Sequence, residues 1–294
     1  DIYLYGKEIN DETYANCKSD MMITGENPEN IRLVNSLSED RFSGDCFDSM
    51  ITNPPYGVSW KSDKRFVEND SQNPNGRFSV GTPRISNGQL LFLQHMISKM
   101  EGKGSRIGIV FNGSPIFTGD SGSGESEIRK WIIENDWLEC IVSLPDQLFF
   151  NTGITTYLWI LSNKKSERRQ GKVQLIDGSS CIDGSSLFVQ MKKSLGNKRK
   201  KIPQDKRDEI VRLYLNFEED VRCQIHPNEF FGYTKVQIEQ PLIEDGKVVT
   251  DRRGNPKPDT SKRDQERVPL QDDVDGYYER EVTIWSRIPL STVN

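Results

Sequence analysis

Apolar residues fall into short runs along the chain, and polar segments separate these runs. Runs of this length, rich in β-branched and aromatic residues, predict buried strands at residues 2–10, 31–34, 46–52, 106–111, 138–144 and 154–161. Apolar periodicity and capping residues predict helices at residues 11–24, 89–100, 125–136 and 204–219. Strands that alternate with helices predict an α/β fold with a doubly wound, mostly parallel sheet.

Two polar segments lie between these predicted elements. Residues 58–88 show no sustained periodicity and predict a long loop, either a lid or DNA-contact loop or a disordered stretch. Residues 112–127 are rich in Gly and Ser and end at a helix cap. This segment is too long for the tight turn that joins strand to helix in nucleotide-binding folds, so we predict a flexible loop.

The composition changes beyond about residue 163. Residues 172–177 predict one more strand, at an edge of the sheet, and residues 277–288 predict a closing helix or strand. Residues 240–275 are polar and contain Gly and Pro, which is typical of a poorly ordered extension or a partner-docking arm. We therefore predict a first domain at residues 1–178 and a C-terminal extension, helical with a flexible arm, at residues 179–294.

Composition narrows the class of protein. The chain has 294 residues, of which 28% are charged, and no apolar run reaches the roughly 18 residues of a membrane helix. No signal-peptide pattern opens the sequence. Five scattered cysteines without C-x-x-C spacing predict free thiols in a reducing cytoplasm, and only two histidines are present, so we expect no metal site. The net charge of −5 means that any contact with DNA must come from a local basic patch or a partner.

The strand at residues 46–52 runs directly into the sequence Asn53-Pro54-Pro55-Tyr56. Each proline lacks an N–H and fixes φ, so the strand must end there in a rigid loop. Pro54 also holds Asn53 in an extended conformation. The result is a rim of acceptors, made by the Asn53 side-chain carbonyl and the Pro54 backbone carbonyl, beside the aromatic face of Tyr56.

Such a rim suits a planar amino group. The exocyclic nitrogen of adenine is a poor nucleophile, and two acceptors holding its hydrogens would favour a pyramidal nitrogen whose lone pair attacks a methyl sulfonium. Tyr56 would stack on a base swung out of its duplex, and Phe150 is a candidate for the second stacking ring. The alternatives are a plain Pro-rich turn for the motif and core packing for Phe149 or Phe150.

The motif stands in an ordered series. Residues 5–10, 53–61, 112–127 and 144–154, and more distantly 194–201 and 231–233, together resemble the modification (methylation) subunit of type I restriction-modification systems. The resemblance implies a fold of the Rossmann-like methyltransferase type and a DNA adenine-N6 methyltransferase that uses S-adenosylmethionine. It also implies double-stranded DNA, a specificity subunit, a second methylation subunit and a restriction subunit as partners.

The resemblance assigns roles to single residues. Its catalytic motif falls on Asn53, Pro54, Pro55 and Tyr56. Its cofactor-binding positions fall on Glu8, Ile9, Asn35 and Asn53, with Glu8 as the acid that accepts hydrogen bonds from the ribose and Asn35 at the adenine edge. An acid at a strand end is also what nucleotide-binding folds use for ribose, although an ordinary solvated Glu would look the same.

A basic strip lies further along, without any acid: Lys192, Lys193, Lys198, Arg199, Lys200 and Lys201. Contacts with phosphates supply most nonspecific affinity for DNA, so the strip is a candidate DNA-binding surface. The alternative is a solvated charged surface.

The chain departs from the family in one respect. The family's Gly-rich cofactor loop follows a strand that lies between the strand ending at Glu8 and the strand ending at Asn53, and neither this strand nor the preceding helical region is found in residues 1–294. We therefore expect that residues 1–294 are a piece of a longer chain whose upstream residues fill this slot, which would leave a gap here, or that the two strands close up or borrow an edge from another copy. Direct pairing of residues 2–5 with residues 47–51 in a well-packed monomer would contradict the missing strand. Two other functions stay open: methylation of another planar amine, in RNA or protein glutamine, and a DNA-clamping or assembly module without turnover.

Overall fold

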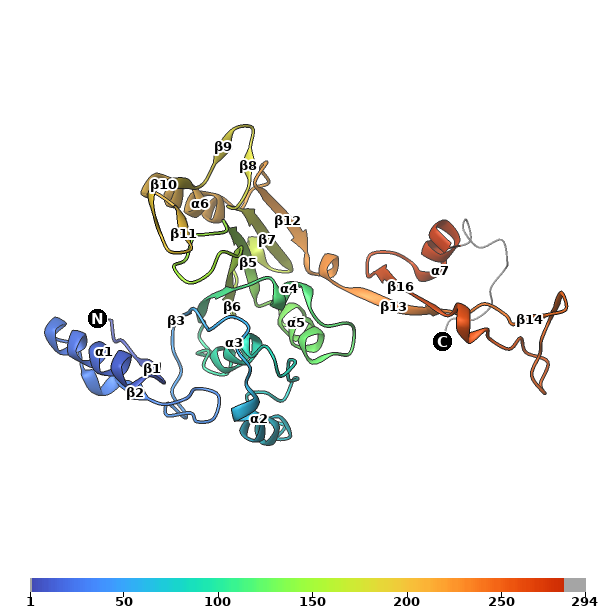
Figure 1. Ribbon diagram of the computed structural model, residues 1–294, viewed down its shortest axis with the longest axis horizontal. Coiled ribbons are helices and arrows are strands. Elements are labelled where there is room, and N and C mark those ends of the chain that lie inside the picture. The colour runs from blue at the N-terminus through green and yellow to red at the C-terminus, as the bar shows by residue number, and fades with distance from the viewer. Residues whose placement is uncertain (1, 283–294) are drawn as a thin grey trace. The chain divides into compact units, whose positions relative to one another are not determined.

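The computed structural model describes residues 2–282, which fall into two compact units, Asp1–His226 and Pro227–Asn294 (Figure 1). None of the helices among the described residues has the length and apolar character that a membrane span requires. The five cysteines are all unpaired.

A six-stranded sheet forms the centre of the first unit. Its strands are β3 (Ser49–Thr52), β4 (Arg106–Phe111), β5 (Leu138–Leu144), β6 (Thr156–Ser162), β7 (Lys172–Asp177) and β12 (Cys223–Pro227), in the order β12-β7-β5-β6-β4-β3. β3 is parallel to β4 and β5 is parallel to β7, whereas β6 runs antiparallel between β4 and β5. β3, β4, β5 and β7 therefore point the same way, which confirms the predicted mostly parallel α/β sheet and brings their carboxyl ends to one edge.

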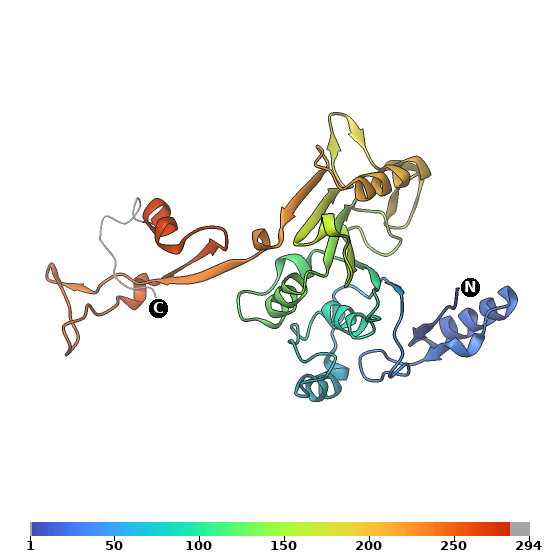
Figure 2. The same cartoon turned by 180° about the vertical axis from the view of Figure 1, so that it is seen from behind.

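Helices bury apolar faces against this sheet. The helices of the first unit are α1 (Asp11–Thr24), α2 (Lys64–Ser71), α3 (Gln89–Ile97), α4 (Ser114–Phe117), α5 (Gly124–Glu134) and α6 (Gln204–Asn216). α6 packs through Leu213 on Cys140 and Ile176, and α3 contributes Leu91 to a second cluster with Trp60 and Val67. Figure 2 shows the arrangement from behind, with α6 at the β7 end of the sheet and α3 at the β4 end.

A second, two-stranded sheet carries the N-terminal part of the site. It consists of β1 (Gly6–Glu8) and β2 (Ile31–Leu33), which are parallel. β1 pairs only with β2 and β3 pairs only with β4 among the described strands, so residues 2–5 do not pair with β3. The structure thus shows the expected gap between the strand that ends at Glu8 and the strand that ends before Asn53. Ile51, on the open edge of β3, is 90% exposed.

Several predictions about single elements need correction. The strand predicted at 2–10 is only Gly6–Glu8, and the predicted loop at 58–88 contains the 3₁₀ turn Lys61–Asp63 and helix α2. The predicted loop at 112–127 contains α4. β7 is not an edge strand, because β12 pairs with its outer side.

The basic strip forms a hairpin. Its strands are β10 (Val189–Leu195) and β11 (Lys198–Lys201), and it follows a smaller hairpin of β8 (Cys181–Ile182) and β9 (Ser185–Ser186). Both hairpins, α6 and β12 belong to the first unit because α6 and β12 complete its core and its sheet. The division between compact units at 226/227 thus differs from the boundary that we predicted at 178/179.

The second unit is built on a two-stranded antiparallel ribbon. Its elements are β13 (Tyr233–Ile238), β14 (Ile243–Glu244), β15 (Lys247–Val248), β16 (Asp264–Pro269), α7 (Val274–Tyr277) and the π-helix Tyr278–Val282. β13 pairs with β16 and β14 pairs with β15, so residues 240–275 contain paired strands where one of our two predictions was a poorly ordered extension; the other, a partner-docking arm, stays a prediction. The part of the predicted closing element beyond Val282 lies outside the described residues.

Candidate active site

The Asn-Pro-Pro-Tyr turn lies at the edge of the main sheet where the carboxyl ends of the parallel strands meet. It follows β3 directly, while the segments that begin at Asn112 and Pro145 follow β4 and β5. Gly57 closes the turn with φ of +63°, a left-handed conformation that strongly favours glycine. Ligands of open α/β sheets bind at this edge.

Asn53 and Tyr56 are brought together by this turn. The Tyr56 hydroxyl donates a hydrogen bond of 2.6 Å to Oδ1 of Asn53. Pro54 is buried and fixes the turn, whereas Asn53 and Pro55 are exposed. Burial raises the pKa of Tyr56, so its hydroxyl stays protonated and remains a donor at neutral pH. The Asn53 amide is therefore held with its oxygen toward Tyr56.

The segment after the turn is fastened to the start of α3. The backbone N–H of Gly88 donates to the carbonyl of Val58 at 3.2 Å, and that of Trp60 donates to Ile85 at 3.1 Å. The Trp60 indole, 3% exposed, donates to the carbonyl of Arg84 at 3.0 Å. Sequence reasoning missed this support, although a lone Trp in a polar segment was a signal that the segment is packed.

Gly124 shapes the same region from the other side. A Cβ at this position would lie 1.9 Å from the backbone oxygen of Thr82, so only glycine permits this approach. The backbone N–H of Arg84 donates to Glu125 at 2.9 Å. The segment leading to α3 is thus held between the turn and the N-terminus of α5.

Glu8 and Asn35 follow the ends of the two neighbouring parallel strands β1 and β2. Oε1 of Glu8 accepts from the backbone N–H groups of Ile9 at 2.7 Å and Asn10 at 2.8 Å, which orients the carboxylate at the strand end. Ile9 is 67% exposed beside it. The Asn35 amide donates to Asp63 at 2.8 Å and accepts from the N–H of Leu37 at 3.0 Å. The polar atoms of Asn35 are thus engaged within the chain, and its predicted place at the adenine edge of the cofactor stays a prediction.

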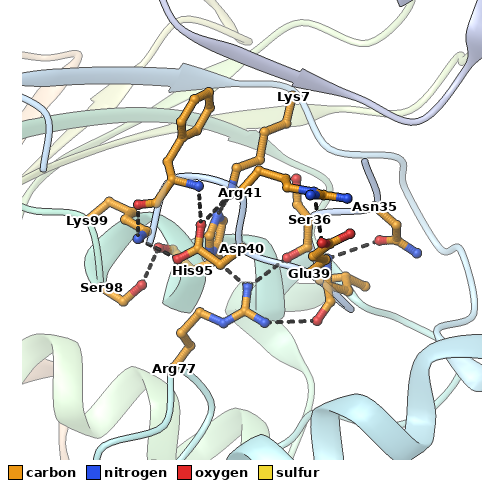
Figure 3. A network of polar contacts seen from close by, with 12 residues as sticks. Lys7, Asn35, Ser36, Glu39, Asp40, Arg41, Arg77, His95, Ser98 and Lys99 are labelled. Atoms are coloured by element: carbon orange, nitrogen blue, oxygen red, sulfur yellow. Dashed lines mark hydrogen bonds and ion pairs between the residues drawn. The ribbon is translucent and has the colours of Figure 1, made fainter. Parts of the chain in front are cut away.

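A polar network joins the Glu8 strand to α3 (Figure 3). Lys7, the neighbour of Glu8, donates to Asp40 at 2.8 Å, and Lys99 forms a second ion pair with Asp40. Lys7 also lies 3.0 Å from Nε2 of His95, and Arg77 lies 3.0 Å from the other ring nitrogen. Because Glu8 and Asn53 stand on different sheets, this network and not strand pairing sets the position of Glu8.

Burial and the charges of this network shift the pKa values of Asp40 and His95. Burial would raise the pKa of Asp40, but the hydrogen bonds from Lys7 and Lys99 hold it well below its usual range. Burial and the nearby cations Lys7 and Arg77 lower the pKa of His95 to about 3. His95 is therefore neutral at physiological pH, and both of its ring nitrogens lie against side chains of the network.

An aromatic group runs beside the polar network. The ring centroids of Tyr5 and Phe42 lie 5.6 Å apart, those of Tyr5 and Phe47 5.4 Å, and those of Phe42 and Phe47 5.9 Å. Phe47 precedes β3 and Tyr5 precedes β1, so these contacts link the approaches to the two sheets without any strand pairing.

Phe150 lies on the loop that connects β5 to β6, at the same edge of the sheet as Asn53. It is 56% exposed, and the ammonium of Lys198 lies 4.5 Å from its ring centroid. No group of three His, Cys, Asp or Glu side chains within residues 2–282 is arranged to hold a metal ion.

The profile of a family described as N-6 DNA Methylase matches residues 1–235. The chain is 27% identical over 253 residues to the methylase subunit of type I restriction enzyme MjaIX from Methanocaldococcus jannaschii, covering 86% of this chain and 42% of that protein. It is 32% identical over 177 residues to the HindI methylase subunit from Haemophilus influenzae, covering 60% and 38%.

A solved structure agrees with these relatives. The crystal structure of a type I restriction-modification methyltransferase subunit from Streptococcus thermophilus matches with a TM-score of 0.64 and 25% identity, covering 77% of this chain and 45% of that one. The chain shares the fold of this methyltransferase subunit, and the Asn-Pro-Pro-Tyr turn lies at the carboxyl edge of its sheet. The chain belongs to the N-6 DNA methylase family, which confirms the predicted resemblance. It spans less than half the length of these relatives.

Proposed function

We propose that this chain carries the catalytic turn of a DNA adenine-N6 methyltransferase, as part of the methylation subunit of a type I restriction-modification system. The observation that carries the proposal is the position of Asn53 and Tyr56 at the carboxyl edge of the sheet in a member of this family. The relatives described above are named as methylase subunits of type I restriction enzymes, and the family is described as N-6 DNA Methylase. These names favour DNA over RNA or a protein glutamine as the substrate.

The residues of the turn would act on the amino group of a flipped adenine. Oδ1 of Asn53 and the carbonyl of Pro54 accept its two hydrogens, and the Tyr56 ring stacks on the base. The hydrogen bond from the Tyr56 hydroxyl presently occupies Asn53 Oδ1, so this oxygen either shares its two lone pairs or releases Tyr56 when the base enters. A neutral amide suffices, because the amino proton becomes acidic only as the methyl is transferred.

The residues at the ends of β1 and β2 fit the cofactor. S-adenosylmethionine supplies the methyl sulfonium when it is bound. The Glu8 carboxylate, oriented by two backbone N–H groups, is a suitable acceptor for ribose hydroxyls, and the exposed Ile9 offers an apolar surface beside it. Asn53 would contact the cofactor from the β3 end. Asn35 would contact it from the β2 end by exchanging its hydrogen bonds with Asp63 and Leu37.

The partners of the complete enzyme are part of the proposal. We expect a specificity subunit to read the DNA sequence, a second methylation subunit to enclose the double-stranded DNA, and a restriction subunit to join for cleavage. The net charge of −5 supports a division of labour in which this chain does not bind DNA alone. Its free thiols and the nature of the task both suit the cytoplasm.

Transfer of a labelled methyl group to duplex DNA tests the function. The complete enzyme, assembled with its specificity subunit, should produce N6-methyladenine, detected by mass spectrometry of the digested DNA. Omitting the specificity subunit should abolish site-specific transfer. Assembly and DNA binding without any methylated base would contradict the proposal and leave the chain as a clamping module. Detection of methylated RNA or methylated glutamine, without methylated DNA, would show that the substrate is RNA or protein and not DNA.

A further inference from the structure

The two faces of the β10–β11 hairpin differ. Side chains alternate across a strand, and on β11 Arg199 and Lys201 are exposed whereas Lys198 and Lys200 are partly buried. Lys192 and Lys193 on β10 are also exposed. By exposure, the basic strip is therefore divided into four exposed residues, called outward below, and two partly buried residues, called inward below.

The two inward lysines hold the loop that carries Phe150. Lys200 forms an ion pair of 2.5 Å with Asp146 and is 13% exposed, and its ammonium lies 4.4 Å from the centroid of Phe188. The ammonium of Lys198 lies over the Phe150 ring. Since the charge of Lys200 is paired with Asp146 and the ammonium of Lys198 lies over an aromatic ring, we do not count these two residues as phosphate ligands.

Backbone hydrogen bonds join the same two segments. The N–H groups of Arg199 and Lys200 donate to the carbonyl of Gln147 at 2.9 Å and 3.1 Å, and that of Asn197 donates to Phe150 at 3.3 Å. The hairpin and the loop after β5 therefore form one structural piece. This piece stands at the carboxyl edge of the sheet, the edge that also carries Asn53.

The outward face has a concentrated positive charge. Residues 189–201 contain no acid, in a chain whose net charge is −5. No ion pair between residues that the structure describes involves Lys192, Lys193, Arg199 or Lys201. Four unpaired cations on a short exposed ribbon match the repeating charge of a DNA backbone, which attracts Lys and Arg without regard to sequence.

We propose that the β10–β11 hairpin is a DNA-backbone contact whose outer face binds phosphates and whose inner face positions Phe150 beside the flipped base. The proposal rests on the proposed function for the identity of the base, but the phosphate contact does not require methyl transfer. Lys198 and Lys200 are positioning residues in this scheme. Phosphate binding at the outer face thereby fixes the loop that receives the base.

Three double or single variants of the complete enzyme separate the two faces. Lys192→Gln/Lys193→Gln and Arg199→Gln/Lys201→Gln remove outward charges, and Lys200→Gln removes an inward one. Lys103→Gln/Lys172→Gln is the matched control, because both lysines are exposed and lie near the amino-terminal ends of β4 and β7, the opposite edge of the sheet. Circular dichroism and assembly with the specificity subunit establish that each variant is folded.

The readouts are the salt dependence of DNA affinity and the flipping of the base. Each outward double variant should lower the slope of log K against log salt by up to about 1.8, that is about 0.9 for each lost phosphate contact, equally for cognate and unrelated DNA. The control and Lys200→Gln should keep the slope. Lys200→Gln should instead reduce the fluorescence increase of 2-aminopurine placed at the target adenine, and Lys200→Arg should restore it.

Unchanged salt slopes in both outward variants would overturn the phosphate contact. If these variants instead lost the specificity subunit while keeping the slope, the hairpin would be a protein contact and the proposal would also fail. Normal 2-aminopurine fluorescence in Lys200→Gln would overturn the role of the inner face. An enzyme that shows the predicted salt slopes but transfers no methyl group would contradict the proposed function and leave the phosphate contact supported.

Discussion

In the proposed mechanism the Tyr56 ring stacks on the base while its hydroxyl orients Asn53, and the two contributions can be separated. Tyr56→Phe keeps the ring and loses one hydrogen bond, which is worth about 1 kcal/mol, so we expect turnover to fall less than about tenfold. Tyr56→Ala also loses the stacking, worth roughly 1–3 kcal/mol per base, so its turnover should fall about fivefold or more beyond that of Tyr56→Phe. Single-turnover methyl transfer by both variants is the measurement. Equal losses would show that the ring does not stack on the base.

His95 should make the free energy of unfolding of the first unit depend on pH. Its pKa is lowered to about 3 in the folded chain, against about 6.5 when unfolded, so the unfolded state binds the proton more tightly. The stability that neutral His95 permits is present above pH 6.5 and is lost as the pH falls toward 3. Between pH 8 and pH 5 this linkage should remove about 2 kcal/mol from the free energy of unfolding.

Urea unfolding followed by tryptophan fluorescence checks this prediction, because four of the five tryptophans, Trp60, Trp131, Trp137 and Trp159, lie in the first unit. His95→Gln should flatten the dependence on pH between 8 and 5. His226→Gln is the matched control, since His226 is the other histidine of the chain, and should keep the dependence. A wild-type chain equally stable at both pH values would contradict the assignment.

At the scale of elements, a buried ion pair fastens α6 to the sheet. Glu139 on β5 is 2% exposed, lies 3.5 Å from Arg169, and accepts a hydrogen bond of 2.8 Å from the Tyr214 hydroxyl on α6. Glu139→Gln leaves the buried Arg169 without its countercharge, which typically costs at least about 3 kcal/mol. Urea unfolding should show this loss. Glu134→Gln, on the exposed side of α5, should change the stability by less than about 0.5 kcal/mol.

The sequence predicts correctly those helices and strands whose bounds depend on their own residues. Helix α1 and strands β4 and β5 begin and end where capping residues or apolar runs predict, and Asn10 caps α1 through Thr13 at 2.9 Å. Helix α2 was not predicted because Val67 is its only buried residue, so its sequence shows no repeating apolar pattern. β7 was placed at an edge because the partner that covers it, β12, follows some 45 residues later in the sequence.

The same limit applies to the site. The Asn53–Tyr56 turn could be predicted because two prolines and one strand determine it locally. The Asp40 network could not, since it joins Lys7, Lys99 and His95 from distant segments that only the fold brings together. The basic strip was found by composition, but its division into outward and inward faces depends on how β11 packs against the loop after β5.

At the scale of the molecule, the two halves of the site stand on separate sheets. Glu8 ends β1, Asn53 follows β3, and no described strand joins them or covers the exposed Ile51. Unpaired strand edges leave backbone donors and acceptors unsatisfied and the cofactor position unsupported. We expect residues 1–294 alone to give no detectable heat on titration with S-adenosylmethionine. Tight binding of S-adenosylmethionine by residues 1–294 that is lost in the Glu8→Gln variant would contradict this prediction.

Asn53 is the residue on which the proposed function depends, and its replacement tests the central claim most directly. The measurement is single-turnover methyl transfer by the complete enzyme carrying Asn53→Ala, with cofactor affinity measured in parallel and Asn75→Ala, an exposed asparagine distant in sequence from the turn, as control. In the proposed mechanism Asn53 acts mainly in the transition state, so transfer should fall about 100-fold or more while cofactor affinity stays within a few-fold. Transfer by Asn53→Ala at the rate of Asn75→Ala would contradict the catalytic assignment.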